Sequence, residues 1–208
     1  MAPVLSDLVN PSSSALLLQE VQEGVVGDSA ALPELAAAAR SAGVIPALRR
    51  LAAAARAAGL PVVHCTAADM PGRFGSNHNA RLFAASSKAG VLGQAGASQV
   101  APVEGLLREG DMMLPRFHGL SPLTGSPLDS LLRNEGVTTL VITGVSLNVA
   151  IPNLVFDAVN RSYQAVVVTD AVAGVPIEYG LQVIEHTLRP LATLATSSEL
   201  IAIWDSNS

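Results

Sequence analysis

The protein has 208 residues, of which 50% are hydrophobic, 14% charged and 3% aromatic, and its formal net charge is −5. This length predicts one domain with a single large core. The acidic balance argues against nucleic acid as a partner, because that would need clustered lysines and arginines, and no apolar run reaches the roughly 18 residues of a membrane span.

In chain order, residues 1–14 are expected to form a flexible N-terminal segment, and one domain is expected at 15–208. Short β-branched runs then alternate with helical stretches, a pattern typical of a parallel sheet covered on both faces. The predicted strands cover 15–21, 61–66, 111–114, 138–144, 164–170 and a last region near 193–203. Helical spacing predicts helices from Val44 to a stop at Gly59, over about 79–89, 150–161 and 177–190. We therefore expect a three-layer α/β/α, Rossmann-like domain whose mostly parallel sheet has about six strands.

The candidate site residues follow from this topology, since ligands of such sheets bind beyond the carboxyl ends of the strands. The long polar loop at 68–100 is expected to be a lid or substrate wall. Candidate substrate-binding residues at this edge and on this loop are Gln22, His78, Arg81, His118, Asn148 and Val149. Backbone N–H groups at 149–151 are expected to face the pocket, because Pro152 lies in the first turn of the predicted helix. Asn148 has a simpler reading as the cap of that helix.

Four segments resemble the isochorismatase-like hydrolase superfamily, the cysteine hydrolases, in their order and spacing. They are ALLLQEVQ at 15–22, PRFHGLSPLTGSPLDSLLR at 115–133, LVITGVSLNVAI at 140–151 and DAVNRSYQAVVVTDAVAG at 157–174. The resemblance places Glu20 on the catalytic aspartate of the family and Arg116 within one residue of its lysine. It places Ala150 on the nucleophilic cysteine. The usual thiolate mechanism is therefore not expected at this position, because a methyl group cannot attack a carbonyl.

The resemblance leaves two functions open. The leading hypothesis is a hydrolase-like protein in which Glu20 acts as an acid on a small anionic substrate, such as a vinyl ether, with Arg116 as a clamp for the anion. A structural ion pair between Glu20 and Arg116 is the competing reading of those two residues. The alternative function is a catalytically inactive member that binds a small molecule or serves in an assembly. The hydrophobic composition also predicts a homo-oligomer.

Cysteine and histidine usage limits the remaining chemistry. The only cysteine, Cys65, is expected to be a buried, inert thiol, and the alternative is a second nucleophile near Glu20. Its neighbour His64 should point to the other face of the strand. The four histidines lack the short spacing of a metal site, and neither G-x-G-x-x-G nor G-x-x-x-x-G-K-[ST] occurs, so we expect no metal and no nucleotide cofactor. A single cysteine and no signal-peptide pattern predict a cytoplasmic location.

Overall fold

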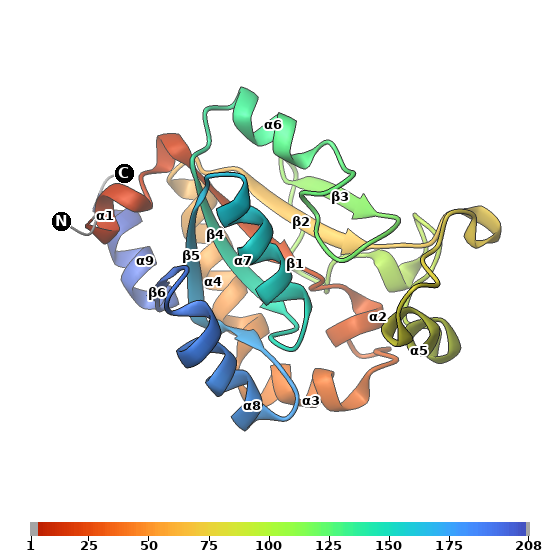
Figure 1. Ribbon diagram of the computed structural model, residues 1–208. Helices are drawn as coiled ribbons and strands as arrows, with labels where there is room; N and C mark the ends of the chain where they lie inside the picture. The colour runs from red at the N-terminus through yellow and green to blue at the C-terminus, as the bar shows by residue number, and fades with distance from the viewer. Residues whose placement is uncertain (1–3, 207–208) are drawn as a thin grey trace.

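The computed structural model describes residues 4–206, and a parallel sheet runs through its centre (Figure 1). Its six strands lie in the order β3-β2-β1-β4-β5-β6, and every neighbouring pair is parallel. The strands are β1 (Ser14–Gln19), β2 (Val62–Ala67), β3 (Met112–Arg116), β4 (Thr139–Val145), β5 (Gln164–Ala173) and β6 (Thr193–Ala195). The predicted α/β architecture and strand number are confirmed.

Helices cover both faces of the sheet, as α4 and α7 show in Figure 1. One face carries α3 (Pro33–Ser41), α4 (Val44–Ala57) and α9 (Ser197–Asp205). The other carries α6 (Leu128–Asn134), α7 (Ala150–Asn160) and the π-helical turn η4 (Val183–Leu188), which continues α8 (Ile177–Gln182). The helix predicted over 177–190 is thus present, with a change of winding at its middle.

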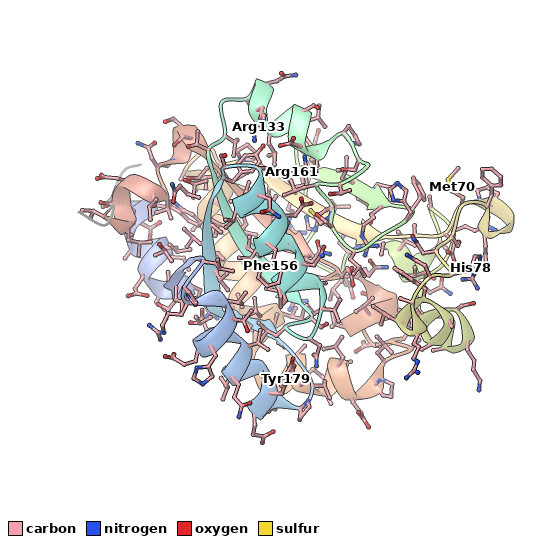
Figure 2. All side chains as sticks on the ribbon, viewed as in Figure 1. Met70, His78, Arg133, Phe156, Arg161 and Tyr179 are labelled. Carbon is pink, nitrogen blue, oxygen red and sulfur yellow. The ribbon has the colours of Figure 1, made fainter. Side chains whose placement is uncertain are left out.

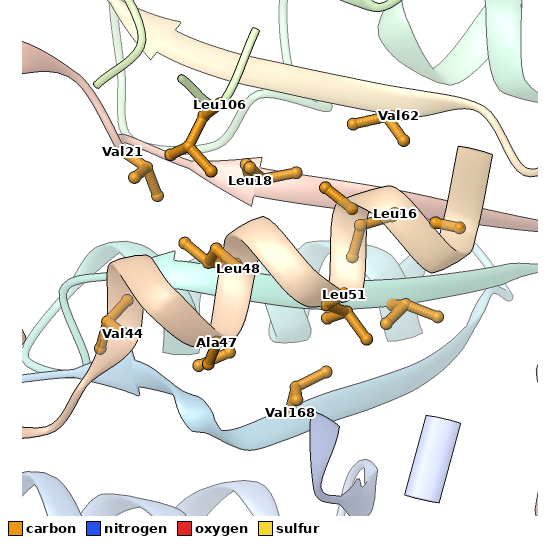
Figure 3. Packing of buried hydrophobic residues seen from close by; sticks show 14 of the residues in the cluster. Leu16, Leu18, Val21, Val44, Ala47, Leu48, Leu51, Val62, Leu106 and Val168 are labelled. Carbon is orange, nitrogen blue, oxygen red and sulfur yellow. The ribbon is translucent and has the colours of Figure 1, made fainter. Parts of the chain in front are cut away.

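Side chains of β1 point alternately to the two faces of the sheet, so this strand contributes to the hydrophobic clusters on both faces. Leu16 and Leu18 pack in the cluster under α4, whereas Leu17 packs in the cluster under α7. In Figure 3, Leu48 and Leu51 of α4 lie against the first of these clusters. Both are fully buried, and burial of a leucine contributes about 1.5–3 kcal/mol. The apolar repeat of α4 therefore fixes which of its faces meets the sheet.

Two segments differ from the prediction. The last strand, expected near 193–203, ends at Ala195, and α9 follows it. Thr196 and Glu199 form a capping box, in which each side chain bonds the backbone N–H of the other residue, and this starts a helix. Within the segment expected to be flexible, the described residues form α1 (Leu5–Leu8) and the 3-10 turn η1 (Pro11–Ser13), and residues 1–3 lie outside the described range. Val9 is fully buried there, and its carbonyl accepts a 2.9 Å hydrogen bond from Trp204 Nε1.

The loops at the carboxyl edge hold four short elements. These are α2 (Glu23–Val26), η2 (Pro71–Arg73), α5 (Arg81–Ala89) and η3 (Ser98–Val100). In Figure 1, α5 and the loop before it project beyond the carboxyl ends of β1 and β2. The short helix expected near 79–89 is confirmed as α5. Across residues 4–206, no helix combines the length and the apolar character needed to cross a membrane.

Gly144 brings β4 unusually close to β1 at the edge where the strands end. Its φ angle is +101°, and a Cβ atom built on it would lie 2.1 Å from the carbonyl oxygen of Gln19. No side chain fits at that distance, and L residues rarely adopt that backbone conformation. Glycine at this position therefore allows β4 to approach the residue that precedes Glu20.

Candidate active site

Glu20 leaves the sheet at the end of β1 in a left-handed conformation. Its φ angle is 52°, which is uncommon for a residue other than glycine, asparagine or aspartate. The backbone N–H of Glu20 still donates to the carbonyl of Cys65 at 2.8 Å, so the chain turns only after this last contact with β2. Strained backbone of this kind is frequent at functional sites. The turn brings the Glu20 carboxylate to the wall of a cavity.

Two donors hold one oxygen of that carboxylate. Gln19 Nε2 donates to Glu20 Oε1 at 3.0 Å, and Arg116 Nη2 donates to the same atom. Within residues 4–206, Glu20 Oε2 accepts no hydrogen bond. The side chain of Glu20 is 19% exposed, so the carboxylate that carries this second oxygen remains accessible to solvent. The arrangement fixes the orientation of the carboxylate and leaves one oxygen for a ligand or water.

The Glu20–Arg116 ion pair weighed from the sequence is present. Arg116 ends β3, and its side chain is only 9% exposed. A second nitrogen, Nη1, donates to the carbonyl of Gly119, which ties the loop after β3 to the site. An arginine keeps its charge under all ordinary conditions and therefore compensates the negative charge of Glu20. Arg116 is thus engaged before any substrate binds.

Helix α7 begins at the same cavity, with Ala150 as its first residue. The carbonyl of Ser146 accepts the N–H groups of Val149 and Ile151, at 3.3 and 3.0 Å. Those two groups are therefore not free, which corrects part of the expectation for 149–151. The N–H of Ala150 donates to no other group in the described part of the chain. It is the helix-terminal donor that remains for an oxyanion or carboxylate.

Asn148 does not cap α7. The cap position is Val149, and no side chain accepts a hydrogen bond there. Instead, Asn148 Nδ2 donates to the carbonyl of Val175, and Asn148 Oδ1 accepts the N–H of the same residue at 2.9 Å. Both ends of the amide thus hold the loop after β5 against the start of α7. Asn148 and Val149 both line the cavity.

The cavity has a volume of about 310 Å³ and lies between the carboxyl ends of the strands and α5. The predicted residues that line it are Glu20, Arg116, His118, Asn148, Val149 and Ala150. A second ion pair, Asp69 with Arg73, also lines it, with a nitrogen–oxygen distance of 3.5 Å. Residues from segments far apart in the chain thus line one cavity, which we call the main cavity.

Three predicted substrate-binding residues are not among those that line the main cavity. Gln22 is fully buried, and its amide bonds the N–H and carbonyl of Ala67 and the carbonyl of Gln99. It therefore braces the long loop. His78 and Arg81 are exposed, and Figure 2 shows His78 on the projecting segment beside α5. His118 is exposed too, but it lies at the cavity wall.

Cys65 matches the expectation of a buried and inert thiol. Its side chain packs in the core under α7 and is 1% exposed. Burial raises the pKa of Cys65 to about 12, although the positive charge of Arg116 acts in the opposite direction. A thiol reacts as its thiolate, so Cys65 is not a nucleophile at neutral pH. His64 points to the opposite face, as expected from the alternation of the strand.

Residues that sequence reasoning missed include Gln19 and a buried cluster around His64. Gln19 is a polar residue that directly follows the apolar run at 15–18, and that change was the available signal. His64 Nε2 lies 3.0 Å from Asp111 Oδ2, and Asp111 also accepts two hydrogen bonds from Arg56. Burial lowers the pKa of His64, against the raising effect of Asp111. The cluster lies under α4 and joins it to the edge of the sheet.

Metal binding finds no support in the described ranges. Among residues 4–206, no group of three or more histidine, cysteine, aspartate or glutamate side chains could hold a metal ion. The acids at the main cavity, Glu20 and Asp69, instead face arginines.

Comparison with known proteins places this architecture among characterised families. Residues 14–199 match the model of the isochorismatase domain. The chain is 40% identical over 79 residues to a ureidoacrylate amidohydrolase, RutB, of Methylobacterium radiotolerans; the match covers 36% of this chain and 30% of that protein. The chain thus matches less than a third of the length of this relative.

Solved structures match over nearly the whole chain. A cysteine hydrolase from Pseudomonas syringae pv. phaseolicola has a TM-score of 0.83 and 20% identity, with 100% of both chains covered. An isochorismatase family protein from Desulfovibrio vulgaris has a TM-score of 0.78 and 26% identity, covering 93% of this chain and 98% of that one. N-carbamoylsarcosine amidase from Thermoplasma acidophilum has a TM-score of 0.68 and 24% identity, covering 89% and 96% of the two chains.

Proposed function

The chain belongs to the isochorismatase domain family, and from that membership we propose that it hydrolyses a small molecule by activating water instead of a cysteine thiol. Position 150 is where the resemblance puts the nucleophile, and Ala150 lines the main cavity with Glu20 and Arg116. The only cysteine is buried, with a pKa raised to about 12. The single observation that carries the proposal is the free Glu20 Oε2 at a cavity without a reactive thiol among its described lining residues.

Glu20 is the residue proposed to move the proton. Its carboxylate accepts a proton from water through Oε2, and the water oxygen bonds to the electrophilic carbon of the substrate. The bond to the leaving nitrogen or oxygen then breaks, and the same proton passes from Glu20 to the leaving atom. The N–H of Ala150 is positioned to stabilise the oxyanion that forms between these steps. Protons and electron pairs balance without a cofactor.

The vinyl ether chemistry expected from the sequence needs Glu20 to begin as an acid. In the reaction proposed here Glu20 begins as a base, because Gln19 and Arg116 both donate to its Oε1 and its Oε2 is left to accept a proton from water. The expected anionic substrate also depended on an uncompensated Arg116. Because the guanidinium already faces Glu20, its charge is compensated before a substrate arrives.

The test is hydrolysis of primary amides, N-carbamoyl amino acids and vinyl ethers by the wild-type protein and by Glu20→Gln. We expect Glu20→Gln to lower kcat at least about 100-fold, the contribution typical of general acid–base catalysis. Glu34→Gln is the matched control, since Glu34 is an exposed acid on α3. Unchanged turnover in Glu20→Gln would exclude a proton-transfer role for this carboxylate.

A catalytically inactive binding protein is the second candidate function. It is favoured by Ala150 and by the internal pairing of Glu20 with Arg116, which leaves the site stable without a substrate. This alternative predicts no turnover of any of these compounds by the wild-type protein, together with saturable thermal stabilisation by a ligand. Turnover that requires Glu20 would reject it.

We also propose that the chain forms a homo-oligomer in a cytoplasmic setting. Large apolar side chains remain exposed, among them Phe156 at 44%, Tyr179 at 46% and Leu181 at 61%. Figure 2 shows Phe156 and Tyr179 on the outer side of α7 and α8. Light scattering at several concentrations tests the assembly, and a monomer throughout would refute it. The unpaired Cys65 supports a reducing compartment.

A further inference from the structure

The charges of the main cavity compensate one another. Among its described lining residues, four carry a formal charge at neutral pH: Glu20, Asp69, Arg73 and Arg116. Each acid faces an arginine, in the pairs Glu20–Arg116 and Asp69–Arg73. Their sum is zero. A substrate that brings its own charge would therefore have to displace one of these partners or stay unpaired at a partly enclosed site, which is costly.

The polar neutral groups of the cavity are also largely engaged. Asn77 Oδ1 accepts the N–H of Gly119 at 2.6 Å, and both ends of the Asn148 amide bond Val175. Arg73 also donates to the hydroxyl of Ser87. These groups hold the loops that shape the cavity. Among the described lining residues, the neutral polar side chains left without a hydrogen bond are those of Ser86, His118 and Ser146.

Apolar side chains form the opposite wall of the main cavity. They come from α2, α3 and the residue before α3 on one side and from α5 and the segment after it on the other, and they include Val25, Leu32, Leu35, Leu82, Phe83 and Leu92. Val25 and Leu35 are also part of the core, so this side of the wall is fixed. The long loop closes against it, because Gln22 bonds the carbonyl of Gln99 and Gly24 lies against the backbone of Val91.

From these contacts we infer that the substrate is electrically neutral and carries an apolar substituent, such as an alkyl chain or a phenyl ring. This inference rests on the proposed function, since it places the group to be hydrolysed beside Glu20 and Ala150. The apolar substituent then lies against the wall formed by α2, α3 and α5. Recognition comes from burial of hydrocarbon, which raises affinity about fourfold for each buried methylene.

The first test measures binding of acetamide, butanamide and hexanamide to the wild-type protein by titration calorimetry. We expect affinity to rise by more than about 100-fold from acetamide to hexanamide, given four added methylenes at about fourfold each. Hexanoate, with the same chain and a negative charge, should bind at least about tenfold more weakly than hexanamide. Equal affinity along the amide series, tighter binding of hexanoate, or no binding by any of these compounds would overturn the inference.

Two variants test whether the apolar wall causes the gain in affinity with chain length. Leu82→Asn should reduce the gain from acetamide to hexanamide at least about fivefold, because it places an amide in the apolar wall. Leu107→Asn is the matched control: Leu107 is 41% exposed, close to the 43% of Leu82, and it does not line the main cavity. An equal effect of both variants would count against the wall.

Glu20→Gln tests the charge argument. This change removes the negative charge that faces Arg116, so the affinity for hexanoate relative to hexanamide should rise about tenfold. Unchanged discrimination between the two ligands would contradict the role of charge compensation. Binding is measured without turnover. If hexanamide binds as expected but no amide is hydrolysed, the proposed function fails and the inference stands; if short anions are hydrolysed with no effect of chain length, the reverse holds.

Discussion

Substituting Ala150 by cysteine tests whether position 150 faces a cavity that lacks a reactive thiol. Ala150 begins α7 and lines the main cavity, so the introduced thiol would lie at a helix N-terminus, where thiolates are stabilised. Wild-type protein supplies the reference, because Cys65 is its only cysteine and is buried. In Ala150→Cys, the reactivity of a thiol at position 150 can thus be compared with that of Cys65 in the same molecule.

The expected difference follows from the two pKa values. At pH 8 a thiol with an ordinary pKa of about 8.5 is roughly a quarter thiolate. Cys65, with its pKa raised to about 12, is about one part in 10,000 thiolate at that pH. The introduced thiol should therefore react about 2,000-fold faster than Cys65 on thiolate content alone. Burial of Cys65 at 1% exposure widens the difference further.

The assay is the rate of reaction with a chromogenic disulfide reagent under native conditions. Under native conditions we expect no rapidly reacting thiol in wild-type protein and one in Ala150→Cys. After denaturation, wild-type protein should show one reactive thiol and Ala150→Cys two. Ala84→Cys, at an exposed position on α5, gives the rate of a thiol outside the main cavity. Rapid reaction of wild-type Cys65, or an unreactive thiol in Ala150→Cys, would refute the reasoning on both the site and the missing nucleophile.

Two further predictions concern stability. Gly144→Ala should lower the free energy of unfolding by about 3–5 kcal/mol, since a Cβ there would lie 2.1 Å from the Gln19 carbonyl oxygen at a φ of +101°. In denaturant titrations Gly136→Ala, with φ +73° and no atom within 4 Å of the added Cβ, should cost only about 1–2 kcal/mol, and equal losses would contradict the close approach. Stability should also fall as pH drops below about 6.5, because burial lowers the pKa of His64 and the unfolded chain then binds the extra proton. His64→Gln should weaken this fall between pH 7.5 and 5.5, whereas His186→Gln, at an exposed position, should retain it; the same dependence in both variants would exclude His64 as the cause.

The sheet was predictable because its strands carry a local signal. Most are short apolar runs, rich in β-branched residues in β2, β4 and β5, and the positions of β1, β2, β4 and β5 agree with the expected ranges within a few residues. The region after Ala195 was predicted as strand because its apolar residues also suit a strand. The sequence TSSE at 196–199 carried the competing signal, a capping box that starts α9.

The candidate site was predictable only where strand ends determine it. Glu20, Arg116 and Ala150 lie at the cavity because parallel strands end at the same edge. The apolar wall could not be predicted. Val25, Leu35 and Leu82 lie on separate short helices, and the loops that place these helices beside one another carry no periodic sequence pattern. Gln22 was expected to bind substrate from its place after β1, but its amide is used by backbone groups of the long loop, a contact between residues 77 apart in the chain.

The contact between Val9 and Trp204 has a practical consequence for handling the protein. The Trp204 indole donates to the Val9 carbonyl, so α1 and α9 lie together on the side away from α5, as Figure 1 shows. A linker attached ahead of α1 or behind α9 would therefore emerge from the same corner. Immobilising the molecule by either linker should leave the mouth of the main cavity open to added compounds, and joining the two linkers gives a short route to a circularly permuted chain with new ends in an exposed loop.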